Sequence, residues 1–291
     1  MTGMSDTEIV QHYSKESLLE YNGEKIPQAL VDHVPSGLTR DQMNFNRMEG
    51  QYKLPPEIEC SYAKILTKVK RPHEYNGPTW RVCNFDTKSH TMSFVRAKYF
   101  DYLVTNLAAH KCITIGSEPL LYLLEDDKKL SDLRKSKAAN SLGVGIMIIT
   151  SDEYTFLELR SKGSSTYPGM LAPSASGGLS GASQPDPFVA IQNEIKQELR
   201  ILPSEVTDLR YLGLTRELKR AGKPEMFFSA RTSLNFYDVQ KSQRSAKDAS
   251  ETEKLVKLDL DNVREPLPEE NMSPAAKANL YFLLHYLRAT R

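Results

Sequence analysis

The sequence predicts a two-domain α/β protein, and two observations lead to this fold class. A charged stretch at 126–137, with few apolar residues, separates two segments that are each long enough to bury a core. In the second segment, strand-like runs alternate with helix-like runs, which is typical of α/β domains. We therefore expect a smaller α+β domain over residues 1–130 and an α/β domain over residues 138–291.

The N-terminal part contains several short candidate elements. They are a polar helix at 7–19, an extended or short helical piece at 26–34, a strand or one-faced helix at 62–69, a β-hairpin of 80–85 and 91–96, and a helix at 97–106. The hairpin is predicted because turn-like residues separate two runs that are rich in strand formers.

The C-terminal part has strand-like runs at 140–150, 154–160, 209–216, 226–231 and 255–260, and a helical run at 275–289. The first run is continuously apolar and predicts a buried strand; the second alternates and predicts its hairpin partner. Ser273 and Pro274 mark the start of the closing helix as an N-cap and a first-position proline.

The most informative stretch lies between residues 174 and 202. A Gly-, Ser- and Ala-rich loop leads to Asp186 and Pro187, a good N-cap and first helical residue. Apolar residues then recur at helical spacing and predict one buried face: Ile191, Ile195, Leu199 and Leu202.

Glu194 and Glu198 lie one turn apart on another face of this helix, which we expect to be exposed. Like charges so placed repel each other, and a bound cation would reverse that cost. The pair beside a flexible glycine loop therefore suggests a divalent-metal site for a diphosphate. A solvated helix face also commonly carries such a pair, so the helix alone leaves both interpretations open.

The order of strand, hairpin strand, glycine loop, acidic helix and further strands resembles the Nudix hydrolase family. The family's box reads G-x5-E-x7-R-E-U-x-E-E-x-G-U, where U is bulky and aliphatic. Aligning its R-E with Asn193-Glu194 places the remaining box positions on Ile195, Gln197, Glu198, Arg200 and Ile201, with the upstream Gly and Glu on Leu179 and Pro185. The resemblance covers about residues 138–265 and implies a Nudix-type α/β/α sandwich with a mixed sheet, preceded by an additional N-terminal domain.

The resemblance implies a pyrophosphohydrolase that acts on acid anhydrides and needs Mg²⁺ or Mn²⁺. The expected substrate is a nucleoside diphosphate linked to another moiety, such as a sugar. Glu194 and Glu198 would be catalytic and hold the metal, the Gly178 carbonyl would be a further metal ligand, and Glu225 would be the base. Plain loop flexibility at Gly178 and an ordinary exposed glutamate at Glu225 are equally good interpretations.

Arg160, Gly177 and Lys223 are the residues we expect to contact substrate on the same resemblance. A strand-end arginine is more often a surface salt-bridge partner. The basic run that contains Lys219, Arg220 and Lys223 is more often a solvated charge run.

Three departures from the box bear on activity. Gln197 has lost a charge, Asn193 cannot replace the box arginine, and Arg200 in place of glycine suggests a different helix end. These departures favour an alternative, a catalytically impaired Nudix-fold module that binds a nucleotide or a protein partner. A third alternative is an interaction scaffold whose purpose lies in the N-terminal domain.

Composition limits the function further. The formal net charge is +1, so no overall field favours nucleic acid or an anionic membrane. Three scattered cysteines, Cys60, Cys83 and Cys112, indicate reduced thiols and a cytoplasmic location. The sequence shows no signal peptide and no apolar run of the ~20 residues that a spanning helix needs. The resemblance adds a homodimer as a further expectation.

Overall fold

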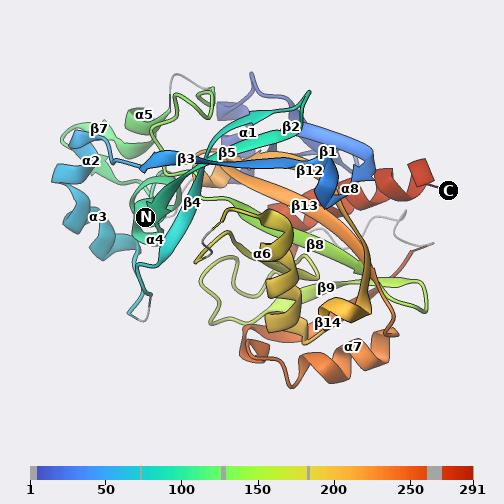
Figure 1. Ribbon diagram of the computed structural model, residues 1–291. Coiled ribbons are helices and arrows are strands. Elements are labelled where there is room, and N and C mark those ends of the chain that lie inside the picture. Colours follow the sequence, from blue (N-terminus) through green and yellow to red (C-terminus); the bar gives the residue numbers. More distant parts are fainter. Residues whose placement is uncertain (1–4, 73, 126–128, 182–183, 261–270, 291) are drawn as a thin grey trace.

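The computed structural model describes residues 5–72, 74–125, 129–181, 184–260 and 271–290. Its largest element is a six-stranded sheet (Figure 1). The strands lie in the order β1 (Leu18–Tyr21), β2 (Glu24–Leu38), β12 (Val206–Glu217), β13 (Lys223–Thr232), β8 (Gly143–Ile149) and β11 (Ala175–Gly178). β13 and β8 run parallel while the other neighbours are antiparallel, so the sheet is mixed.

Both faces of this sheet are covered by helices. Ile146 and Ile148 of β8 belong to the same core as residues of α6 (Pro187–Glu194), whereas Met147 and Ile149 belong to the core that includes α8 (Pro274–Thr290). Successive residues of a strand point to opposite faces, so one buried strand contributes to two cores. The predicted α/β/α sandwich is therefore confirmed.

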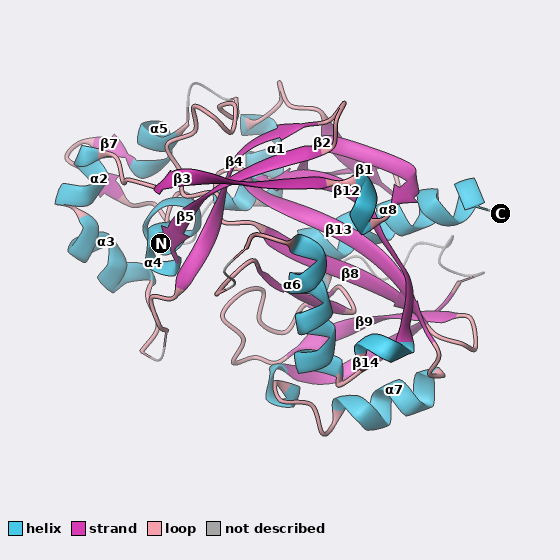
Figure 2. Cartoon of the chain, in the orientation of Figure 1, coloured by secondary structure: helices cyan, strands magenta, loops and turns pink. Residues whose placement is uncertain are grey.

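A second sheet lies below the first in Figure 2 and has the order β10 (Leu171–Ala172), β9 (Tyr154–Arg160) and β14 (Thr252–Asp259). The prediction that residues 154–160 pair with the preceding strand is wrong. Both edges of β8 are already paired, one with β13 and the other with β11, so β9 leaves that sheet after the turn. It pairs with β10 and β14 instead.

The N-terminal part has a three-stranded sheet in the order β3 (Asn44–Gln51), β5 (Thr91–Lys98) and β4 (Pro78–Asp86), which confirms the predicted hairpin. The predicted helix at 7–19 is too long, because α1 (Asp6–His12) is short and β1 begins at Leu18, where alternate side chains are buried. The other elements here are α2 (Pro56–Cys60), α3 (Tyr62–Val69), α4 (Tyr99–Tyr102), η2 (Leu103–Leu107), β6 (Thr114–Ile115), β7 (Glu118–Pro119) and α5 (Leu120–Leu124).

The two predicted domains share one sheet, because β2 of the N-terminal part pairs with β12 along most of its length. The division into residues 1–130 and 138–291 therefore stays a prediction, and residues 126–128 of the charged stretch lie outside the described residues. Within the described part of the chain, no helix is long and apolar enough to cross a membrane.

Candidate functional site

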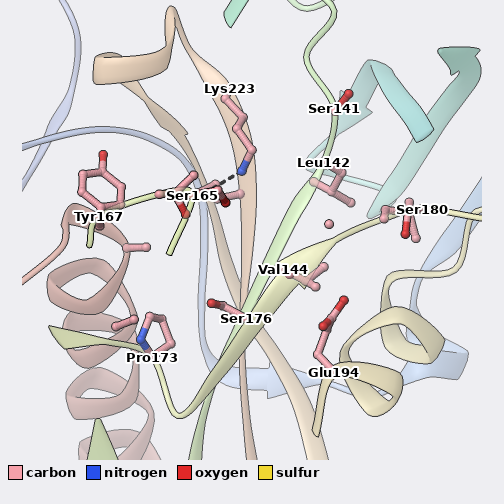
Figure 3. Close-up of a pocket in the computed structure, with 18 of the residues that line it drawn as sticks. Ser141, Leu142, Val144, Ser165, Tyr167, Pro173, Ser176, Ser180, Glu194 and Lys223 are labelled. Atoms are coloured by element: carbon pink, nitrogen blue, oxygen red, sulfur yellow. Dashed lines mark hydrogen bonds and ion pairs between the residues drawn. The ribbon is translucent and has the colours of Figure 1, made fainter. Parts of the chain in front are cut away.

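A cavity of about 370 Å³ opens between β11, β13, β9 and the acidic helix. Figure 3 shows Glu194 and Lys223 on either side of β11. The cavity brings together every residue that the sequence suggested for the site: Arg160, Gly177, Gly178, Glu194, Glu198, Lys223 and Glu225. We call this cavity the acidic pocket, because carboxylates line one of its walls.

The acidic helix begins as predicted. The Asp186 carboxylate caps it by accepting hydrogen bonds from the backbone N–H groups of Phe188 and Val189. α6 passes at Ile195 into a π-helical turn, η3 (Ile195–Leu199), a feature that is often found at functional sites. Because this helix packs against β11, its acidic face is turned toward the sheet.

Glu198 is buried, with only 5% of its surface exposed, so the prediction of an exposed pair is wrong for this residue. The edge strand β11 covers it, and the Ser176 backbone N–H donates a 2.9 Å hydrogen bond to Glu198 Oε2. Burial, together with the nearby charges of Glu158 and Glu194, raises the pKa of Glu198 well above its usual range. A cation placed here would relieve that cost.

Glu194 is half-buried, and its side chain makes no hydrogen bond or ion pair with another described residue. Burial raises its pKa to about 7, and the charges of Asp248 and Glu251 add to the effect. Its carboxylate lies against the backbone of Gly177, where an added Cβ would stand 2.1 Å from Glu194 Oε1. Glycine is therefore needed at position 177 so that the Glu194 carboxylate can lie this close to the β11 backbone.

The expected glycine loop is a strand at this point, which corrects the prediction. Gly177 and Gly178 pair with Val144 and Gly143 of β8 as part of β11. Neither glycine has a positive φ, although Gly181 further along does. The site is consequently built on a sheet edge, which holds the backbone in a fixed position next to Glu194.

Arg160 lines the pocket but is already engaged with two carboxylates. Its Nη1 lies 3.2 Å from Glu158 Oε1, and its Nη2 lies 3.4 Å from Glu251 Oε2. Its Nε also donates to the Thr166 carbonyl. A role for Arg160 in substrate binding stays a prediction, and its present contacts join β9 to the segment that carries Glu251.

Lys223 and Glu225 form a close ion pair on β13, with 2.7 Å between Lys223 Nζ and Glu225 Oε1. Burial opposes ionisation of Glu225, but Lys223 and Arg220 outweigh it and lower its pKa. A carboxylate held ionised in this way can accept a proton, although the lowered pKa makes it a weak base. The role of Glu225 as base stays a prediction.

The basic run on the β12–β13 connection is buried where it meets the pocket, so the prediction of a solvated charge run is wrong there. Arg220 Nε lies 3.3 Å from Glu217 Oε1, and the Arg220 guanidinium stacks over the Tyr167 ring. The Tyr167 hydroxyl donates to Glu217. Only Lys219 of the run stays partly exposed, in an ion pair with Asp6.

Several pocket residues could not be found from local sequence patterns. They are Tyr99 and Tyr102 of the N-terminal part, Tyr167, and the two acids Asp248 and Glu251. The aromatic run at 99–102 gave a signal that also fits an ordinary core. Nothing near Asp248 and Glu251 in the sequence indicates that they reach a helix about fifty residues earlier.

The acidic pocket offers donors that suit a divalent ion. Glu194 and Glu198 offer hard oxygen donors at a place where burial disfavours their ionised forms. Among the described residues, no three Asp, Glu, His or Cys side chains already form a group that could hold a metal. Mg²⁺ typically uses one or two carboxylates and completes its shell with water and substrate phosphates, so the two donors fit.

Comparison with known proteins agrees with the resemblance. No model of a known protein family matches the chain. The chain is 23% identical over 286 residues to Nudix hydrolase 9 of Arabidopsis thaliana, an alignment that covers 84% of this chain and 87% of that protein. The chain is a divergent relative of the Nudix hydrolases. Since the alignment covers so much of the chain, the similarity to this Nudix protein includes part of the N-terminal segment.

Solved structures of Nudix proteins are similar to about half of the chain. The Nudix hydrolase RenU of M. smegmatis is 13% identical, with coverage of 52% of this chain and 88% of that chain and a TM-score of 0.35. The Ap4A hydrolase of C. elegans is 16% identical, with coverage of 52% and 97% and a TM-score of 0.33.

Proposed function

We propose that this protein hydrolyses the diphosphate of a nucleoside diphosphate that is linked to another group, such as a sugar, and that it uses Mg²⁺ or Mn²⁺. The observation that carries the proposal is the position of Glu194 and Glu198. Both line the pocket, and neither forms an ion pair with a described arginine or lysine. The relation to Nudix hydrolase 9 supports hydrolysis as the activity.

In this proposal Glu198 and Glu194 would hold the divalent ion, with the Gly178 carbonyl as a further donor. The ion would neutralise charge on the diphosphate. Lys223 reaches the pocket from β13 and would bind a phosphate oxygen, while Glu225 keeps its ammonium group in place.

The reaction is the addition of water across a phosphoanhydride. The water oxygen forms a bond to one phosphorus, the bond from that phosphorus to the bridging oxygen breaks, and the bridging oxygen leaves with the other phosphate. Glu225, which lines the same pocket and is held ionised by Lys223, would take the proton of the attacking water.

Glu198→Gln is the variant that tests the proposal. We expect the wild type, given Mn²⁺ and a set of nucleoside diphosphate sugars, dinucleotides and coenzymes, to release a nucleoside monophosphate from at least one. Glu198→Gln should lower turnover by about 100-fold or more and still fold, because glutamine can accept the Ser176 N–H bond. Wild-type activity in this folded variant would disprove the role of Glu198.

A non-catalytic nucleotide-binding module is the second candidate. It is favoured by the exposed Asn193, by Gln197, and by the lack of a preformed group of three metal ligands among the described residues. Calorimetry separates the two candidates: nucleotide binding without any Mg²⁺ or Mn²⁺ binding would support the module.

A further inference from the structure

Two of the residues that depart from the Nudix box contact a single segment of the chain, residues 242–251. This segment begins in the last turn of α7 (Phe236–Gln243) and ends with η6 (Ala249–Glu251). The Lys247 Nζ donates to Gln197 Oε1 at 3.2 Å, and the Asp248 N–H donates to the Gln197 carbonyl at 3.1 Å. The side chain at position 197 is thus directed at the segment and does not line the pocket.

Arg200, the second departure, makes its contacts with the same segment. Arg200 Nη1 donates to Ser245 Oγ at 2.7 Å, and the Ser242 hydroxyl donates to the Arg200 carbonyl at 3.1 Å. Arg200 itself has a φ of 56°, the left-handed conformation that glycine favours. The prediction of a different helix end is therefore wrong. Arg200 adopts the backbone conformation that glycine would adopt at this position, and its side chain adds a contact with segment 242–251.

The far end of segment 242–251 is fixed on the other side of the pocket. The Glu251 carbonyl accepts hydrogen bonds from the Ser161 N–H at 2.7 Å and from the Ser164 hydroxyl at 3.3 Å. The next residue, Thr252, pairs with Arg160 at the start of β14. The segment is consequently held at both ends, by the acidic helix and by β9.

Docking in this way brings two carboxylates to the pocket. Asp248 and Glu251 both line it, and the charges of both act on Glu194. The box positions that carry acids in the family are occupied here by Gln197 and Pro185, which are uncharged. Two negative charges are lost from the helix and its loop, and Asp248 and Glu251 bring two to the pocket. Lys247 of the same segment acts on Glu194 in the opposite sense but does not line the pocket.

We propose that segment 242–251 compensates for the altered box: Gln197 and Arg200 dock it, and Asp248 and Glu251 supply the negative charge that the acidic pair needs to bind a divalent cation. This inference rests on the proposed function and deepens it. Gln197 and Arg200 are positioning residues. Asp248 and Glu251 attract the cation by their charge without coordinating it directly.

The test is a calorimetric titration of the full chain with Mn²⁺ alone. We expect the double variant Asp248→Asn/Glu251→Gln to bind Mn²⁺ about tenfold or more weakly than the wild type. Glu253→Gln is the matched control, since Glu253 is exposed and does not line the pocket; its affinity should stay within about twofold of the wild type. Unchanged affinity in the double variant overturns the proposal.

Gln197→Glu provides a second test that does not weaken the site. If position 197 were only a lost ligand, this variant would bind Mn²⁺ more tightly. Because its side chain contacts Lys247, we expect affinity within about twofold of the wild type. A gain of about tenfold would overturn the proposal.

The outcomes also separate this inference from the proposed function. If Glu198→Gln abolishes Mn²⁺ binding while the double variant binds normally, the inference fails and the proposed metal site stands. If the double variant loses Mn²⁺ binding but the wild type hydrolyses no diphosphate substrate, the hydrolase proposal fails and the inference stands.

Discussion

At the residue scale, the account depends on how closely Glu194 approaches the sheet. Its carboxylate occupies the space that a side chain at position 177 would need, since an added Cβ would be 2.1 Å from Glu194 Oε1. The neighbouring Gly178 has no such constraint, because the nearest heavy atom to its added Cβ is the Leu142 carbonyl oxygen at 4.0 Å. Two adjacent glycines thus have different reasons for being glycine.

Gly177→Ala should therefore displace the Glu194 carboxylate and weaken Mn²⁺ binding by about tenfold or more. Gly178→Ala is the matched control and should leave Mn²⁺ binding unchanged, because alanine keeps the backbone carbonyl and its methyl group comes no nearer than 4.0 Å to the Leu142 carbonyl oxygen. Calorimetric titration of both variants measures the difference. Equal affinities in the two variants would contradict the assigned position of Glu194.

His110 gives a prediction that is independent of the pocket. Burial, with a contribution from nearby His12, lowers the pKa of His110 from its ordinary value of 6.5 to about 4. Between these values the unfolded chain binds a proton that the folded chain excludes, so stability falls as pH falls from 6.5 to 4. The slope is at most about 1.4 kcal/mol per pH unit.

His110→Phe should remove this contribution to the pH dependence. Urea unfolding at several pH values between 4 and 7 would measure it as the difference in slope between the variant and the wild type. An identical pH dependence in both proteins would show that His110 is not buried in its neutral form.

At the element scale, the sequence predicted elements with strong local signals. Three such features were predicted correctly: the N-cap Asp186, the apolar strand β8, and the strands β12 and β13. Each depends on a capping residue or an apolar run, which can be recognised from a few neighbouring positions. Strand β11 was missed because its sequence, ASGG, lacks large side chains that would show alternation. The pairing of β9 was missed because a strand pattern does not specify its partner.

The candidate site shows the same division. The acidic pair and its neighbours on β9, β11 and β13 were predicted, since the family resemblance places them in order along the chain. Asp248 and Glu251 were not, because they reach the pocket through contacts of segment 242–251 with Gln197 and Arg200 at one end and with Ser161 at the other. Those contacts join residues that lie far apart in the sequence and leave no periodic signal.

At the scale of the whole molecule, the main sheet combines both predicted domains. β2 covers the outer edge of β12, and Gln28 of β2 donates to Glu225 in the pocket at 3.4 Å. Its side chain also accepts a hydrogen bond from the buried Thr215 hydroxyl. Gln28 thus supports Glu225 from behind, while Tyr99 and Tyr102 of the N-terminal part line the pocket itself.

A fragment of residues 138–291 should consequently not fold as a stable monomer. Removing β2 would expose the long edge of β12 and leave buried polar groups such as Thr215 without a partner. Size-exclusion chromatography and circular dichroism of this fragment would show aggregation or lost structure. A stable, monomeric fragment would instead support two independent domains.

The central claim is that Glu194 and Glu198 bind a divalent cation beside β11. The most direct measurement is an anomalous difference map from crystals soaked in Mn²⁺. We predict a peak between the two carboxylates, about 2.1 Å from their oxygens and next to Gly177. A map at saturating Mn²⁺ without a peak there, or with its only peak elsewhere, would contradict the claim.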